Sequence, residues 1–223
     1  MERAGPDATA AIERLLDLLE HDDTAPTSVR ERAEALDVHV ADSLSGLELA
    51  EVRQAQRIAD LGAGAGFPGL VLAAALPEAH VWLVESVGRK CAFLGRAIAA
   101  MGLSNAGVVN ARAEAWPAGR GAHDLITARA LAPLNVLVEY AAPLLVEGGA
   151  LVAWKGRRVA AEEDDGAAAA AALGMEPHEV TRVQPFPDAR ERHLYVYLKV
   201  GQTPNGYPRR PGMASKRPLR AST

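Results

Sequence analysis

A glycine-rich segment followed by an acidic residue is the pattern in this sequence that most clearly predicts chemistry. The segment Asp60–Gly69 reads DLGAGAGFPG and separates an expected strand from an expected helix. Glycines at such a turn let the backbone bend sharply and approach a ligand. Glu85 ends the next expected strand, 19 residues beyond Gly66, where an acidic side chain accepts hydrogen bonds from both ribose hydroxyls. Together they predict a site for an adenosine-bearing cofactor.

The glycine spacing and the charge of Asp60 discriminate among such cofactors. Gly62, Gly64 and Gly66 follow G-x-G-x-G, whereas dinucleotide sites use G-x-G-x-x-G. A pyrophosphate prefers a helix N-terminus free of carboxylates. S-adenosylmethionine instead brings a sulfonium cation and an ammonium group, which Asp60 would stabilise directly or through water. The electrostatics therefore favour S-adenosylmethionine over NAD. Capping of the loop's own N–H groups is a second role for Asp60, compatible with the first.

Other chemistry-bearing residues form weaker patterns. Cys91 lies on an expected helix among apolar residues, where a core thiol is favoured over a nucleophile. The six histidines show no metal-ligand spacing, so no metal site is expected. His39 and Asp42 share one face of an expected helix, either as a cofactor lid or as a surface contact. The stretch ARALAP at 128–133 replaces the N/D-P-P-Y/F motif of exocyclic amino methyltransferases, which favours a ring nitrogen or an oxygen as acceptor.

Length and composition bound the class of protein. The chain has 223 residues, of which 49% are apolar and 23% charged, as in one soluble globular domain with short additions. Its single cysteine excludes an internal disulfide and suits a reducing cytoplasm. No stretch approaches roughly eighteen unbroken apolar residues, so no membrane span is expected. The N-terminus lacks the basic start and apolar run of a signal peptide.

Strands that alternate with helices are expected over residues 57–200. The expected strands cover 57–61, 80–85, 107–110, 124–128, 150–154, 175–183 and 193–199, and the expected helices 68–76, 88–101, 133–146 and 159–173. This order predicts an α/β, Rossmann-like fold: right-handed parallel βαβ units with helices on both faces and an antiparallel hairpin at one edge. Trp82 and Trp154 are expected in the core.

Residues 1–56 are expected to form a helical N-terminal cap. Apolar residues recur at helical spacing over residues 10–20, and Pro26 breaks the chain after them. Thr27 is expected to cap a second short helix, and Ser43 to begin a third.

Residues 201–223 are expected to form a basic, flexible tail without regular structure. This segment carries five basic residues and no acidic one, which leaves −9 on the rest of a chain whose net charge is −4. Such a tail either binds polyanions or stays solvated. Lys155 and Arg157, at the end of an expected strand, likewise suggest either phosphate contacts or a solvated cluster.

Motifs spread along the chain resemble the RsmG (GidB) family of small-subunit ribosomal RNA guanine-N7 methyltransferases. They are HVADSL (39–44), DLGAGAGFPGL (60–70), ESVGRKCAFL (85–94), ARAEAW (111–116), ITARALAPL (126–134), AWKGR (153–157), ERHLYV (191–196) and YPRRPGMASKRPL (207–219). The resemblance implies a class I methyltransferase fold, S-adenosyl-L-methionine as cofactor, and methyl transfer to N7 of a guanine in 16S rRNA. It also implies rRNA or the small ribosomal subunit as partner, and a cytoplasmic location.

The resemblance also implies roles for individual residues. Cofactor contacts are implied for Asp60, Gly62, Gly64, Phe67, Glu85, Ser86, Val87, Ala113, Glu114 and Arg129. Arg129 is the expected catalytic residue, as an orienting group, because guanine N7 has an exposed lone pair and needs no obligatory base. The candidates for RNA contact are Lys155, Arg157, Arg209, Arg210, Lys216 and Arg217.

Two alternatives and one departure accompany the resemblance. A noncatalytic ribosome-associated protein could share the fold, and so could a small-molecule methyltransferase that uses S-adenosylmethionine. HDDTAPTSVR at 21–30 replaces an aromatic and asparagine-bearing segment of the family and keeps only Thr27 and Ser28. The way the N-terminal surface meets RNA is therefore open.

Overall fold

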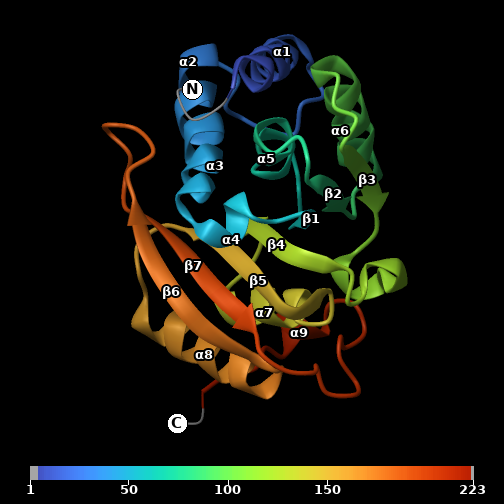
Figure 1. The fold of residues 1–223 in the computed structure, drawn as a ribbon, viewed down its shortest axis with the longest axis vertical. Helices are drawn as coiled ribbons and strands as arrows, with labels where there is room; N and C mark the ends of the chain where they lie inside the picture. The colour runs from blue at the N-terminus through green and yellow to red at the C-terminus, as the bar shows by residue number, and fades with distance from the viewer. Residues whose placement is uncertain (1–4, 222–223) are drawn as a thin grey trace.

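A seven-stranded sheet runs through the molecule in the computed structural model, which describes residues 5–221 (Figure 1). Its strands are β1 (Arg57–Leu61), β2 (His80–Glu85), β3 (Ala106–Asn110), β4 (His123–Arg129), β5 (Leu145–Lys155), β6 (Met175–Val183) and β7 (Arg192–Lys199). The order is β3-β2-β1-β4-β5-β7-β6, with β7 antiparallel to both β5 and β6 and the other pairs parallel. The predicted mostly parallel sheet with an antiparallel edge is confirmed. The strand order reverses between β1 and β4, and ligands bind at such a point, beyond the carboxyl ends of the strands.

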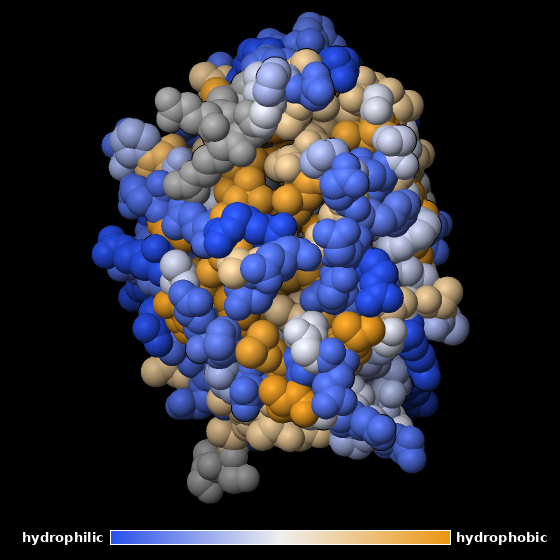
Figure 2. Space-filling model, viewed as in Figure 1, coloured by the Kyte–Doolittle hydropathy of each residue, from blue (hydrophilic) through white to orange (hydrophobic). Residues whose placement is uncertain are grey.

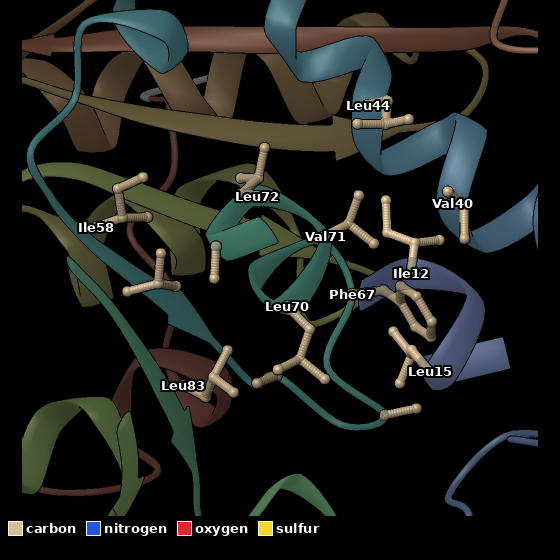
Figure 3. Packing of buried hydrophobic residues seen from close by; sticks show 14 of the residues in the cluster. Ile12, Leu15, Val40, Leu44, Ile58, Phe67, Leu70, Val71, Leu72 and Leu83 are labelled. Atoms are coloured by element: carbon tan, nitrogen blue, oxygen red, sulfur yellow. The ribbon is translucent and has the colours of Figure 1, made fainter. Parts of the chain in front are cut away.

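Helices cover both faces of the sheet. On one face lie α1 (Pro6–His21), α5 (Gly69–Ala75) and α6 (Gly88–Met101); on the other lie α7 (Leu134–Ala141) and α8 (Ala160–Ala172), beside the short α9 (Met213–Lys216) (Figure 1). Each face has its own cluster of buried apolar side chains. Figure 3 shows Ile12 and Leu15 of α1 beside Phe67, which leads into α5. The N-terminal helix is therefore part of the core.

A nearly continuous helical run joins α1 to the sheet. It consists of α2 (Arg32–Ala35), a π-helical turn (Leu36–Ala41), α3 (Asp42–Leu44), a 3-10 turn (Ser45–Glu48) and α4 (Ala50–Arg53). The predicted helix starts at Thr27 and Ser43 are wrong. Glu31 caps α2 instead, because its carboxylate accepts the N–H groups of Ala33 and Glu34. Ser43 lies inside the run, where its hydroxyl donates to the carbonyl of His39.

Two further expectations about the sheet are wrong. The helix expected to reach residue 146 ends at Ala141, and β5 begins at Leu145 and runs through Gly148 and Gly149. A register shift between β4 and β5 accommodates these glycines within the strand. Trp82 is 37% exposed rather than buried; its ring lies over Gly107 of the edge strand β3. Trp154 is buried, as predicted.

The C-terminal residues 201–221, which we call the strap, lie along α7 and α8. Tyr207 and Leu219 pack against the apolar cluster on that face, and Asn135 of α7 donates to the carbonyl of Leu219. These contacts order the segment, so the expected lack of regular structure is wrong for α9. The division into 1–56, 57–200 and 201–223 stays a prediction.

The surface in Figure 2 is mostly hydrophilic, with smaller apolar areas between polar side chains. Within residues 5–221, none of the helices combines the length and apolar character needed to span a membrane.

Candidate functional site

A cavity of about 310 Å³ opens at the carboxyl ends of β1, β2, β3 and β4. Its size lies at the lower end of the range for small-molecule sites, roughly 300–1,000 Å³. The structure brings six of the predicted cofactor residues to its walls: Gly62, Glu85, Ser86, Val87, Ala113 and Glu114. They come from three separate loops, which the parallel sheet gathers at one edge. This is the arrangement that the glycine segment and Glu85 predicted.

Glu85 fixes the glycine loop as well as facing the cavity. Its Oε2 accepts the N–H of Gly64 at 3.2 Å, and its Oε1 accepts the N–H of Val87 at 2.8 Å. The residue is only 5% exposed, and Lys90 Nζ lies 3.9 Å from Oε2. An ionised carboxylate has about four acceptor sites. Two are used within the protein, which leaves acceptor capacity toward the cavity.

Asp60 lies beneath the loop and does not line the cavity. Its Oδ2 accepts the N–H of Gly69, the first residue of α5, at 3.0 Å, and its Oδ1 accepts the hydroxyl of Thr127 at 2.9 Å. Complete burial raises the pKa of Asp60 to about 6, although these two hydrogen bonds and Arg129 act in the opposite direction. The capping role is therefore the one observed, and it ties β1, β4 and α5 together.

Arg129 ends β4 and points to the N-terminal helical run rather than lining the cavity. Its Nη1 donates to the carbonyl of Val38 at 3.0 Å and to Asp42 Oδ2 at 2.8 Å, and its Nη2 lies 3.2 Å from His39 Nδ1. The guanidinium carbon lies 5.4 Å from the ring centre of Phe67. Phe67 is buried and is likewise absent from the cavity wall. We call Arg129 and the side chains around it, those of His39, Asp42, Phe67 and Arg192, the Arg129 cluster.

His39 is held in its neutral form within the same cluster. Burial, followed by the nearby charge of Arg129, lowers the pKa of His39 to about 4. The ring stacks on Phe67 with centroids 4.5 Å apart, and Nε2 lies 2.9 Å from Thr27 Oγ1. A neutral ring has one donor and one acceptor nitrogen, so it accepts from Arg129 and donates to Thr27. His39 and Asp42 thus support Arg129; they are neither a lid over the cavity nor a simple surface pair.

Arg192 is a member of this cluster that the sequence analysis missed. Its Nε lies 3.3 Å from Asp42 Oδ1, so the nearly buried carboxylate of Asp42 sits between two guanidinium groups. Arg192 belongs to the ERHLYV motif, which was the available signal. Two cations against one carboxylate leave the Arg129 cluster with a net positive charge.

The chain turns sharply between the Arg129 cluster and the cavity. Ala130 has φ +54°, a left-handed conformation that is costly for any residue with a Cβ. Ala130 and Leu131 line the cavity, although Arg129 just before them does not. A Cβ on Gly62, which has φ +67°, would lie 2.6 Å from Leu131 Cδ1. The turn at Ala130 and Leu131 therefore connects the Arg129 cluster to the cavity and packs against the glycine loop.

The predicted RNA contacts separate into two groups. Lys155 is engaged inside the protein, where its Nζ pairs with Glu162 at 2.6 Å and donates to the carbonyl of Ala132. Arg209 is bound to the buried Glu139. The remaining four lie on the exposed surface: Arg157, Arg210, Lys216 and Arg217.

Three polar side chains that were not predicted also line the cavity, those of Lys90, Arg112 and Tyr140. Lys90 and Arg112 lie in motifs already noted, but Tyr140 comes from α7 and has no local signal. Trp116, which ends the ARAEAW motif, packs against the ring of His123.

Neither a reactive cysteine nor a metal centre is part of this site. The Cys91 thiol donates to the carbonyl of Glu85, and its pKa is raised by partial burial and then by the charge of Glu85, so it stays a thiol. Across residues 5–221 no group of three or more His, Cys, Asp or Glu side chains could hold a metal ion.

Comparison with known proteins points to one family. The model of the GidB family, described as rRNA small subunit methyltransferase G, matches residues 10–195. A ribosomal RNA small subunit methyltransferase G from Rubrobacter xylanophilus is 46% identical over 197 residues, covering 86% of this chain and 76% of the relative. One from Roseiflexus castenholzii is 42% identical over 201 residues, covering 86% and 83%. A crystal structure of a variant of MtNAS in complex with S-adenosylmethionine has a TM-score of 0.57 at 14% identity, covering 86% of this chain and 73% of that one.

Proposed function

The chain belongs to the rRNA small subunit methyltransferase G (GidB) family, and from this premise we propose how its residues divide the work of methylating N7 of a guanine in 16S rRNA. The observation that carries the proposal is the cavity at the carboxyl ends of the strands, with the glycine loop on one wall and the Glu85 carboxylate on another. The cofactor is S-adenosylmethionine.

The residues that line the cavity offer the contacts that an adenosine needs. Glu85 accepts hydrogen bonds from the ribose hydroxyls, since its carboxylate is already held in place by Gly64 and Val87. Gly62 lets the chain pass close to the ligand, where a side chain would already meet Leu131. Ala113 and Glu114 border the adenine. The bound cofactor supplies an electrophilic methyl group on a sulfonium.

The Arg129 cluster orients the guanine and does not carry a proton. Guanine N7 attacks with its own lone pair, so the enzyme mainly has to align N7 with the methyl group at about 3–3.5 Å. His39 fits this assignment, because both of its nitrogens are engaged by Arg129 and Thr27. Asp42 and Arg192 hold the fork of Arg129 in one orientation. A fixed guanidinium fork suits planar recognition of a base edge or a phosphate.

The RNA substrate must present its guanine outside a regular helix. In A-form RNA the N7 edge lies in a deep, narrow major groove that side chains do not reach. The target therefore lies in a loop or an unstacked site of small-subunit rRNA, either free or in the assembled subunit. The exposed Arg157 and the exposed cations of the strap are the candidate phosphate contacts. This substrate assigns the protein to the cytoplasm.

The test is methyl transfer from labelled S-adenosylmethionine by the purified protein. Deproteinised small-subunit rRNA, assembled small subunits and large-subunit rRNA are offered in parallel. Label in small-subunit rRNA or subunits, with none in large-subunit rRNA, is the expected result. If the protein binds S-adenosylmethionine and labels none of these RNAs, a small-molecule acceptor replaces the proposal. If it does not bind S-adenosylmethionine, the fold serves as a noncatalytic scaffold.

A further inference from the structure

The strap is anchored to α7 by an ion pair that the proposed reaction does not use. Arg209 Nε donates to Glu139 Oε1 at 2.7 Å, and Nη2 of the same guanidinium donates to Oε2. Glu139 is 1% exposed, so this is a bidentate pair between a buried carboxylate and a partly buried arginine. Removing one partner of such a pair leaves the other charge buried and unpaired. The pair therefore fixes where the strap crosses α7.

From this anchor the strap reaches the wall of the cavity. Gly212, three residues after Arg209, has φ +81°, and its N–H donates to Glu114 Oε1 at 2.9 Å. Ser215 Oγ lies 3.1 Å from the hydroxyl of Tyr140. Glu114 and Tyr140 both line the cavity. The strap thus holds two wall residues that come from different elements, a 3-10 turn (Ala113–Ala115) and α7.

We propose that the strap is a positioning element of the cofactor site. Arg209, bound to Glu139, holds Gly212 against Glu114 and Ser215 against Tyr140, and these contacts set the wall of the cavity beside the adenine. The inference rests on the proposed placement of adenosine in this cavity. It gives Arg209 a role in cofactor affinity, in place of the RNA contact expected from its charge.

The sequence supplies a matched control beside Arg209. Arg210 carries the same side chain on the same segment but is exposed. Arg209→Gln alone would leave the buried charge of Glu139 unpaired. The test variant therefore combines Glu139→Gln with Arg209→Gln, which removes both charges together. Arg210→Gln changes the strap's net charge by the same amount as Arg209→Gln without touching the anchor.

Affinity for S-adenosylhomocysteine and for methylthioadenosine is measured by calorimetry well below the melting temperature, with circular dichroism to confirm folding. The double variant should bind both adenine ligands about tenfold more weakly, as for the loss of one well-placed polar contact. Its KM for S-adenosylmethionine should rise, while kcat and the KM for RNA stay the same. Arg210→Gln should bind both ligands like the wild type. A double variant that melts earlier but binds them with wild-type affinity shows a purely structural strap and overturns the inference.

A second measurement needs only the wild-type chain. Coupling between two sites is reciprocal. If the contacts of the strap strengthen ligand binding, then ligand binding must stabilise the contacts of the strap. Backbone hydrogen exchange at Gly212 should slow when S-adenosylhomocysteine binds, and unchanged exchange there contradicts the inference. If the wild type does not bind S-adenosylhomocysteine, the proposed cofactor site fails. If binding depends on Glu85 but not on the strap, only this inference fails.

Discussion

Replacing Glu85 by alanine should weaken both cofactor binding and the glycine loop, by amounts that follow from its hydrogen bonds. Two ribose hydroxyls lose an ionised acceptor, which at roughly 1.5–3 kcal/mol corresponds to about 10–150-fold in the dissociation constant. The N–H groups of Gly64 and Val87 also lose their acceptor. Water in the cavity replaces part of this loss, so we expect the free energy of unfolding to fall by about 1–2 kcal/mol.

The assay is calorimetric titration with S-adenosylhomocysteine, together with urea unfolding of the free protein. Glu85→Gln keeps one oxygen acceptor for the two loop N–H groups and should give an intermediate loss of affinity. Glu176→Ala, an exposed acid on β6, controls for the change in net charge and should bind like the wild type. If Glu85→Ala loses stability but keeps its dissociation constant, the carboxylate serves only the loop and the ribose assignment is wrong.

Asp42→Ala should release Arg129, so that kcat falls at least about tenfold while calorimetry gives an unchanged affinity for S-adenosylhomocysteine; a normal kcat refutes the positioning role. Gly62→Val should abolish methyl transfer, because valine is strained at φ +67°, and a normal rate excludes the loop as the cofactor cradle. Burial raises the pKa of Asp60 from 3.8 in the unfolded chain to about 6 in the folded protein. Between these pH values the folded state binds a proton that the unfolded state does not, so this group raises the free energy of unfolding by about 3 kcal/mol as the pH falls from 6 to below 3.8. The pKa of His39 is lowered from 6.5 to about 4, so its contribution is lost as the pH falls from 6.5 toward 4. In urea unfolding at several pH values Asp60→Asn should steepen the acid loss of stability and His39→Gln should reduce it; parallel curves contradict both assignments. Neutralising the exposed cations of the strap should flatten the salt dependence of RNA binding and spare cofactor affinity, and an unchanged slope removes them from the RNA interface.

The predicted parts of the fold are those governed by local periodicity. The alternation of strand and helix patterns along the chain predicted the parallel sheet. The bounds of β2 and α6 are those expected from the sequence. Gly62, Glu85 and Glu114 met at one cavity because parallel strands bring all their carboxyl ends to one edge. That conclusion needs only the order of elements along the chain, which a sequence supplies.

The missed parts depend on contacts between distant residues. Arg129 and Asp42 are 87 residues apart in sequence, and only the fold of the N-terminal run brings them to 2.8 Å. The strap has no apolar period, so nothing local predicts that Arg209 pairs with a glutamate 70 residues earlier. The family resemblance implied a cofactor contact for Phe67; in the structure its ring stacks on His39, and the residue is not among those that line the cavity.

The site of methylation can be read by mass spectrometry of the modified nucleoside. Small-subunit rRNA that lacks the modification is incubated with the purified protein and S-adenosylmethionine, then digested to nucleosides, with an Arg129→Ala reaction in parallel. We expect 7-methylguanosine in the wild-type reaction and a strong loss of it with the variant. A methyl group on another atom or base, or full 7-methylguanosine formation without Arg129, would contradict it.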